Sequence, residues 1–148
     1  LNSGISTLAP VDRALARLAS DRVKHVWIHG GPRYPRAVRQ LTEQSHGSHA
    51  DETETSLMLA MAPHLVDMTR AEASPALKQE TPGALTPSDP NSPNYSRSGS
   101  FGDPTRATAA KGEALLAAML DDLDEQAAAF IAQGSAPQPM PPMESVLR

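Results

Sequence analysis

Two histidines and three carboxylates lie close together in one short segment, His46-Gly-Ser-His-Ala-Asp-Glu-Thr-Glu54. Histidine and carboxylate side chains at this spacing can transfer protons or bind a metal ion. The segment also permits a structural interpretation, because Asp51 followed three residues later by Glu54 has the pattern of a capping box at a helix start. The function of the chain depends on which interpretation holds.

A metal site built within this segment is one alternative. His46 and His49 are three residues apart with carboxylates nearby, but a zinc site needs three or four converging ligands. Asp51 and Glu52 are expected to form a solvated first turn that complements the helix dipole. The other histidines stand alone and are expected to be surface or core residues rather than ligands: His25, His29 and His64.

The spacing of apolar residues predicts the elements that must position this cluster. Helical periodicity predicts helices over residues 9–20, 51–62 and 105–132. Another helix, rich in arginine and with little apolar surface, is expected over residues 35–44. A β-branched and aromatic run predicts a strand over residues 23–28. Trp27, near the end of that strand, is expected in the core, with a wall of a substrate site as the alternative. Asp103-Pro104 is expected to cap and open the last helix.

Composition limits the classes of protein to consider. The chain has 148 residues, 14 prolines and 3% aromatic residues, which favours one domain with long irregular segments. We expect a domain over residues 1–134 with a Pro-rich loop over 73–104, followed by an extended Pro-rich tail over 135–148. The net charge of −4 does not indicate nucleic-acid binding. With no cysteine and no run of about 18 apolar residues, a cytoplasmic protein outside the membrane is expected.

Three stretches of the chain carry a family resemblance. From His49 onward, a histidine lies five residues before Glu54 and Thr-Ser-Leu-Met-Leu follows; Asn2-Ser-Gly-Ile-Ser-Thr7 has the pattern Asn-x-Gly-x-Ser/Thr. Gly99-Ser-Phe-Gly-Asp-Pro-Thr-Arg-Ala-Thr-Ala-Ala-Lys-Gly112 has the pattern Gly-x-x-Gly-Asp-Pro-x-x-Ala-Thr-x-x-Lys-Gly. In this order and rough spacing they resemble motifs of the creatininase (creatinine amidohydrolase) family.

The resemblance implies a fold and an activity. The fold is expected to be α/β, a three-layer α/β/α arrangement with a mainly parallel sheet. The activity implied is metal-dependent hydrolysis of a cyclic or linear amide, either a small molecule or a peptide. By similarity His49 is the general acid/base, and Glu54 lies beside it to orient it. The alternative for Glu54 is a capping role alone, and both roles are compatible.

The resemblance covers residues 1–132 but corresponds only to the C-terminal half of such an enzyme. The implied divalent ions, zinc or manganese, are therefore expected to be held mainly by an N-terminal portion, with no metal ligand assigned in this chain. We expect that portion as a separate chain or cleavage product, in a homo- or hetero-oligomer such as a hexamer. The alternative function is a non-catalytic interaction or scaffolding subunit of the same fold.

Overall fold

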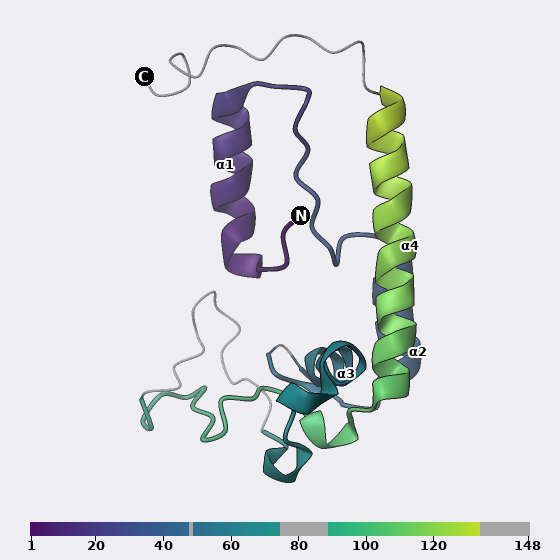
Figure 1. Cartoon of the computed structure of the whole chain (residues 1–148). Helices are drawn as coiled ribbons and strands as arrows, with labels where there is room; N and C mark the ends of the chain where they lie inside the picture. Colours follow the sequence, from purple (N-terminus) through teal and green to yellow (C-terminus); the bar gives the residue numbers. More distant parts are fainter. Residues whose placement is uncertain (48, 75–88, 134–148) are drawn as a thin grey trace.

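The computed structural model describes residues 1–47, 49–74 and 89–133 and folds them into four α-helices joined by loops and short turns (Figure 1). The helices are α1 (Leu8–Leu18), α2 (Arg33–Leu41), α3 (Glu52–Met61) and α4 (Ala109–Gln133). Each lies close to one of the helices expected from the sequence, so these four predictions are confirmed in type and approximate position. The 3₁₀ turns are η1 (Ile5–Thr7), η2 (Pro63–Leu65), η3 (Met68–Arg70) and η4 (Pro104–Arg106).

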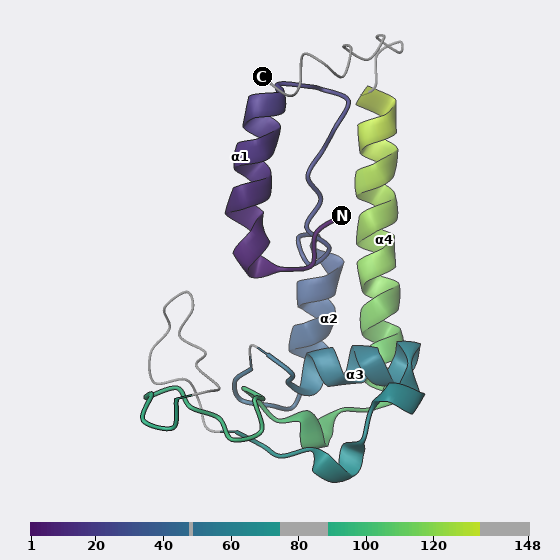
Figure 2. The ribbon, with the colours of Figure 1, turned by 60° about the vertical axis from the view of Figure 1, so that its left-hand side comes forward.

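The main core of the described residues lies where α2 and α3 pack against α4 (Figure 2). Its buried apolar residues are Tyr34, Leu57, Leu115 and Met119. Helix α3 crosses the N-terminal part of α4, and the two backbones approach closely at Gly112. A Cβ atom on this glycine would overlap the carbonyl oxygen of Ser56, so the absence of a side chain permits the contact.

Helix α1 lies away from α3, beside the extended segment that follows it (Figures 1 and 2). Its apolar residues recur at helical spacing as predicted, but none of its residues is buried. Leu18 at its C-terminal end is 41% exposed. Asp12 Oδ1 and His25 Nδ1 are 2.7 Å apart and join α1 to the extended segment. The described residues therefore cover the apolar face of α1 only in part.

The prediction of a strand over residues 23–28 is wrong for the described structure. Trp27 forms one parallel bridge with Asn2, in which Asn2 N–H donates to Val26 at 2.8 Å and Ile28 N–H donates to Asn2 at 3.0 Å. A strand needs a neighbour that continues the ladder, and no further segment of the described chain supplies one. The sheet implied by the resemblance is therefore not seen in this part of the molecule.

The expected Pro-rich loop and tail are only partly described. Residues 75–88 of the loop and 134–148, which include the tail, lie outside the described residues. At the described end of the loop, Asp103 caps η4 by accepting a hydrogen bond from Thr105 N–H at 3.2 Å, and Pro104 is the first residue of that turn. Asp103-Pro104 thus opens a 3₁₀ turn ahead of the last helix and not, as expected, the helix itself. Within the described ranges, no helix has both the length and the apolar character needed to cross a membrane.

Candidate active site

His49 and Glu54 lie side by side at the start of α3. The distance from His49 Nδ1 to Glu54 Oε2 is 3.5 Å, and the two side chains are 58% and 51% exposed. The same Glu54 oxygen accepts a hydrogen bond from Ala50 N–H at 2.6 Å. The structure therefore brings together the two residues that the sequence singled out, and it leaves both open to a ligand.

The helix start combines capping with a sharp turn of the backbone. Asp51 is the N-cap of α3, and its Oδ1 accepts hydrogen bonds from Thr53 N–H at 2.9 Å and Glu54 N–H at 3.0 Å. In a capping box Glu54 would bond the N–H of Asp51, but here it bonds Ala50 instead. Ala50 has a φ of 45°, which is unfavourable for a residue with a side chain. This turn redirects the chain between His49 and the helix.

The motif that begins at Gly99 is also hydrogen-bonded to His49. Phe101 N–H donates to His49 at 2.7 Å, and His49 N–H donates back to Phe101 at 3.4 Å. Gly102 follows with a φ of 144°, and a Cβ atom there would lie 2.5 Å from Asp51 Cβ. Two of the motifs that are far apart in the sequence thus form one structural unit around His49.

The expectation that Asp51 and Glu52 form a solvated turn is wrong. Asp51 is 6% exposed and Glu52 is fully buried. Glu52 Oε2 accepts hydrogen bonds from Glu43 N–H at 2.8 Å and Gln44 N–H at 2.7 Å, while Lys111 Nζ lies 2.5 Å from Oε1. A buried carboxylate is tolerated when it is paired and hydrogen-bonded in this way. Glu52 is a structural anchor rather than part of the solvated site.

Gln44 connects this anchor to the rest of the site. Its Nε2 donates to Asp51 Oδ2 at 2.8 Å. Its Oε1 accepts hydrogen bonds from Glu52 N–H at 3.1 Å and from Asp103 N–H at 3.0 Å. One side chain therefore joins the helix start to the late motif, a role that nothing in the sequence pattern indicated.

The described residues offer no complete metal site. No group of three or more His, Cys, Asp or Glu side chains within the described ranges could hold an ion. His46 Nε2 pairs with the Ser74 carbonyl at 3.0 Å, whereas His49 pairs with Glu54. The alternative of a metal site shared by His46 and His49 therefore finds no support in this part of the chain.

Three aromatic side chains form a cluster of which two members feel the charge of Glu54, a link that the sequence pattern did not indicate. The His29 ring stacks on Tyr34 with centroids 4.9 Å apart, and Trp27 meets His29 edge-on at 5.6 Å. Burial lowers the pKa of His29, while the charge of Glu54 raises it, and the net direction is down. Burial, with smaller effects of the Asp51 and Glu54 charges, raises the pKa of Tyr34 to about 12.

His29 and Tyr34 are thus within electrostatic range of Glu54, although His29 was expected to stand alone. The only hint in the sequence is Gly30-Gly31-Pro32 between them, a stretch whose composition is typical of a turn. Trp27 is only half-buried, and its place beside His29 is compatible with either of the predicted roles.

A cavity of about 320 Å³ opens beside Glu54. Its lining residues come from the start and middle of α3 and from the segment that follows this helix: Ala50, Glu54, Thr55, Met58, Leu65, Val66 and Asp67. A solvent-open imidazole–carboxylate pair next to a hollow can exchange protons with a bound molecule.

Comparison with known proteins identifies relatives of this chain. The family model described as "Creatininase: Creatinine amidohydrolase" matches residues 4–126. A "Mycofactocin precursor peptide peptidase" of Mycobacterium ulcerans is 32% identical over 126 residues, which are 70% of this chain and 46% of that protein.

Solved structures agree with the family match. A mutant creatininase matches with a TM-score of 0.58 and 27% identity, and "Creatininase Mn" matches with a TM-score of 0.57 and 26% identity. Each match covers 81% of this chain and 49% of the solved one. The chain therefore spans about half the length of these relatives, and over that half its fold is creatininase-like.

Proposed function

Because the chain belongs to the creatininase (creatinine amidohydrolase) family, we propose that it forms the part of an amidohydrolase that carries His49 as general acid/base. Glu54 is the positioning residue of this pair. The observation that supports the proposal is the 3.5 Å approach of Glu54 to His49 Nδ1 in the motif that the resemblance singled out.

The geometry suits the proton transfers of amide hydrolysis. A proton must leave the attacking water, and another must reach the leaving nitrogen. Glu54 faces Nδ1 of His49, and within the described residues Nε2 has no hydrogen-bond partner, so this nitrogen is free to accept and return a proton. Glu54 in turn is held by Ala50 N–H, which fixes the orientation of the imidazole.

The metal of the proposed enzyme has to be held elsewhere. The described residues do not fit a divalent ion, since they contain no group of three candidate ligands. One structural neighbour is described as "Creatininase Mn", which supports manganese as a candidate beside zinc. We place the ligands in polypeptide beyond the described residues, and the steps assigned to His49 do not depend on them.

Two features support completion of this part by further polypeptide. His25 Nε2 and Trp27 Nε1 are buried without a hydrogen-bond partner, although buried polar atoms are normally satisfied. The bridge between Asn2 and Trp27 is the start of a parallel ladder that further strands could extend. The proposed whole is the three-layer α/β/α domain with a mainly parallel sheet, assembled as an oligomer.

A linear amide is the favoured substrate class. The relative from Mycobacterium ulcerans is described as a peptide peptidase, and the cavity beside Glu54 has the apolar walls of Met58, Leu65 and Val66. Such walls accommodate side chains of a peptide better than a small polar ring alone. Creatinine is the second substrate to be assayed.

The test is hydrolysis of short peptides and creatinine by the purified native assembly, together with its metal content. His49→Ala should lower the rate about 100-fold or more at unchanged metal content and melting temperature. His64→Ala, which removes an exposed histidine of η2, is the matched control and should keep full activity. A metal-free assembly with intact His49 and no activity would overturn the proposal and favour a scaffolding subunit.

A further inference from the structure

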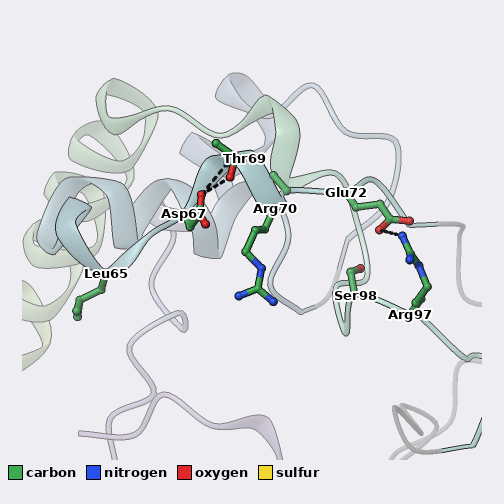
Figure 3. Close-up of a pocket in the computed structure, with 8 residues that line it drawn as sticks. Leu65, Asp67, Thr69, Arg70, Glu72, Arg97 and Ser98 are labelled. Atoms are coloured by element: carbon green, nitrogen blue, oxygen red, sulfur yellow. Dashed lines mark hydrogen bonds and ion pairs between the residues drawn. The ribbon is translucent and has the colours of Figure 1, made fainter.

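A second, larger cavity adjoins the one beside Glu54. It has a volume of about 750 Å³ and lies between residues 65–72 and the loop at Arg97 and Ser98 (Figure 3). Leu65 and Asp67 line both cavities. The two hollows therefore adjoin at these two residues.

The charged side chains of this second cavity are not equivalent. Arg97 Nη2 is paired with Glu72 Oε2 at 3.0 Å. Asp67 Oδ1 accepts hydrogen bonds from Thr69 Oγ1 at 2.6 Å and Thr69 N–H at 3.1 Å, and these bonds lower the pKa of Asp67, with a smaller effect of the Arg70 charge.

Arg70 is different, because its guanidinium makes no ion pair or hydrogen bond with any residue that the structure describes. Figure 3 shows its side chain extending between the Asp67–Thr69 pair and the Glu72–Arg97 pair. A guanidinium carries a planar array of donors that matches a carboxylate. Arg70 is exposed, and an exposed guanidinium without an ion pair at the wall of a cavity is suited to bind one.

We propose that Arg70 binds a carboxylate of an extended peptide substrate whose scissile amide lies at His49. This inference rests on the function proposed above and specifies the substrate: a peptide with an apolar residue near the cleaved bond and an anionic group farther along. The apolar residue would lie on Leu65, which is 69% exposed between the two hollows. The carboxylate is that of the peptide C-terminus or of an acidic side chain.

Binding is measured in the His49→Ala background, so that turnover does not consume the probe. Three dansylated peptides serve as probes: Ala-Leu-Leu-Ala with a free C-terminal carboxylate, the same peptide with a C-terminal amide, and Ala-Leu-Leu-Glu with a C-terminal amide. At low salt, where screening of exposed charges is weak, a carboxylate-bearing probe should bind about tenfold more tightly than the uncharged amide.

The substitution Arg70→Gln should abolish this preference. Arg70→Lys keeps the positive charge but loses the planar donor array of the guanidinium, so it should retain part of the preference. Arg39→Gln removes an exposed charge on α2 and should leave the preference intact. Preference for the free acid identifies the C-terminus as the source, and preference for the glutamyl amide identifies a side chain. Either supports the proposal.

Equal binding of all three probes, or a preference that persists in Arg70→Gln, would overturn the inference about Arg70. That failure is distinguishable from failure of the proposed function. If the function is wrong, the assembly with intact His49 hydrolyses none of the peptides, whereas the carboxylate preference and its dependence on Arg70 are measured without turnover.

Discussion

Phe101 holds His49 by two backbone hydrogen bonds, one from its N–H to the carbonyl of His49 at 2.7 Å and one in the opposite direction at 3.4 Å. The late Gly-x-x-Gly-Asp-Pro motif, which begins at Gly99, is thus hydrogen-bonded directly to the proposed catalytic segment. Lys111 of the same motif pairs with buried Glu52, and Gly112 packs on Ser56. The motif is a support for the helix start that carries His49 and Glu54.

This arrangement makes a prediction for the two glycines with positive φ in the motif. Gly99 has a φ of 79° with no atom near its absent side chain, whereas Gly102 has a φ of 144° and its Cβ would lie 2.5 Å from Asp51 Cβ. Backbone strain costs about 1–3 kcal/mol at either site, but overpacking adds about 1–3 kcal/mol only at Gly102.

Gly102→Ala should therefore lower the free energy of unfolding by roughly 2 kcal/mol more than Gly99→Ala, as measured by urea denaturation. It should also lower hydrolysis, because Asp51 and the His49 backbone must shift. Equal losses in the two variants would mean that the close contact at Asp51 does not constrain the site.

The sequence predicted the helices because their apolar residues recur at helical spacing, which is a local property. It placed the start of the last helix too early, at residue 105 rather than Ala109, because Asp103 and Pro104 first form a separate 3₁₀ turn. The strand over residues 23–28 was wrong because pairing depends on a neighbour that the local pattern does not contain.

The site was predictable in part because His49 and Glu54 are close in the sequence, so their proximity is also a local property. The proximity of His49 and Glu54 is confirmed by their 3.5 Å separation, while their catalytic roles stay predictions. The burial of Glu52 could not be foreseen, because its partner Lys111 comes from a distant helix. The effect of Glu54 on the pKa of His29 likewise depends on the folded structure, in which His29 stacks on Tyr34.

Asp122 is a second buried carboxylate with a testable role. Its oxygens accept hydrogen bonds from Arg33 N–H at 2.9 and 3.1 Å and from Tyr34 N–H at 2.9 Å, so it caps α2 from α4. Burial would raise the pKa of Asp122, but the hydrogen bonds of Tyr34 and Arg33 and the Arg33 charge lower it, and the net direction is down. The folded state therefore favours the ionised form.

A carboxyl group with a lowered pKa in the folded state stabilises the fold above its unfolded pKa of about 3.9. That contribution is lost as the pH falls through the folded value. Asp122→Asn should reduce stability by about 1–2 kcal/mol at pH 7 and flatten the loss of stability between about pH 5 and pH 3.

The measurement is the urea midpoint as a function of pH. Asp124→Asn changes an exposed carboxylate on the same helix and should leave the profile as in the native protein. An Asp122→Asn profile parallel to the native one would show that Asp122 does not keep its charge preferentially in the folded state.

His29 and Glu54 are linked electrostatically. Glu54 raises the pKa of His29 against the larger, lowering effect of burial. Removing the carboxylate charge in Glu54→Gln should therefore lower the pKa of His29 further, because the neutral imidazole is then favoured by burial alone. The His29 resonance in an NMR pH titration reports this change directly.

Glu72→Gln is the matched control, since Glu72 is an exposed carboxylate paired with Arg97 and has no effect on His29. It should leave the His29 titration unchanged, while the melting temperature confirms that both variants are folded. A His29 titration that is the same in Glu54→Gln and in the native protein would separate His29 from the His49–Glu54 pair. A downward change would show that the Glu54 carboxylate acts electrostatically on the His29 imidazole.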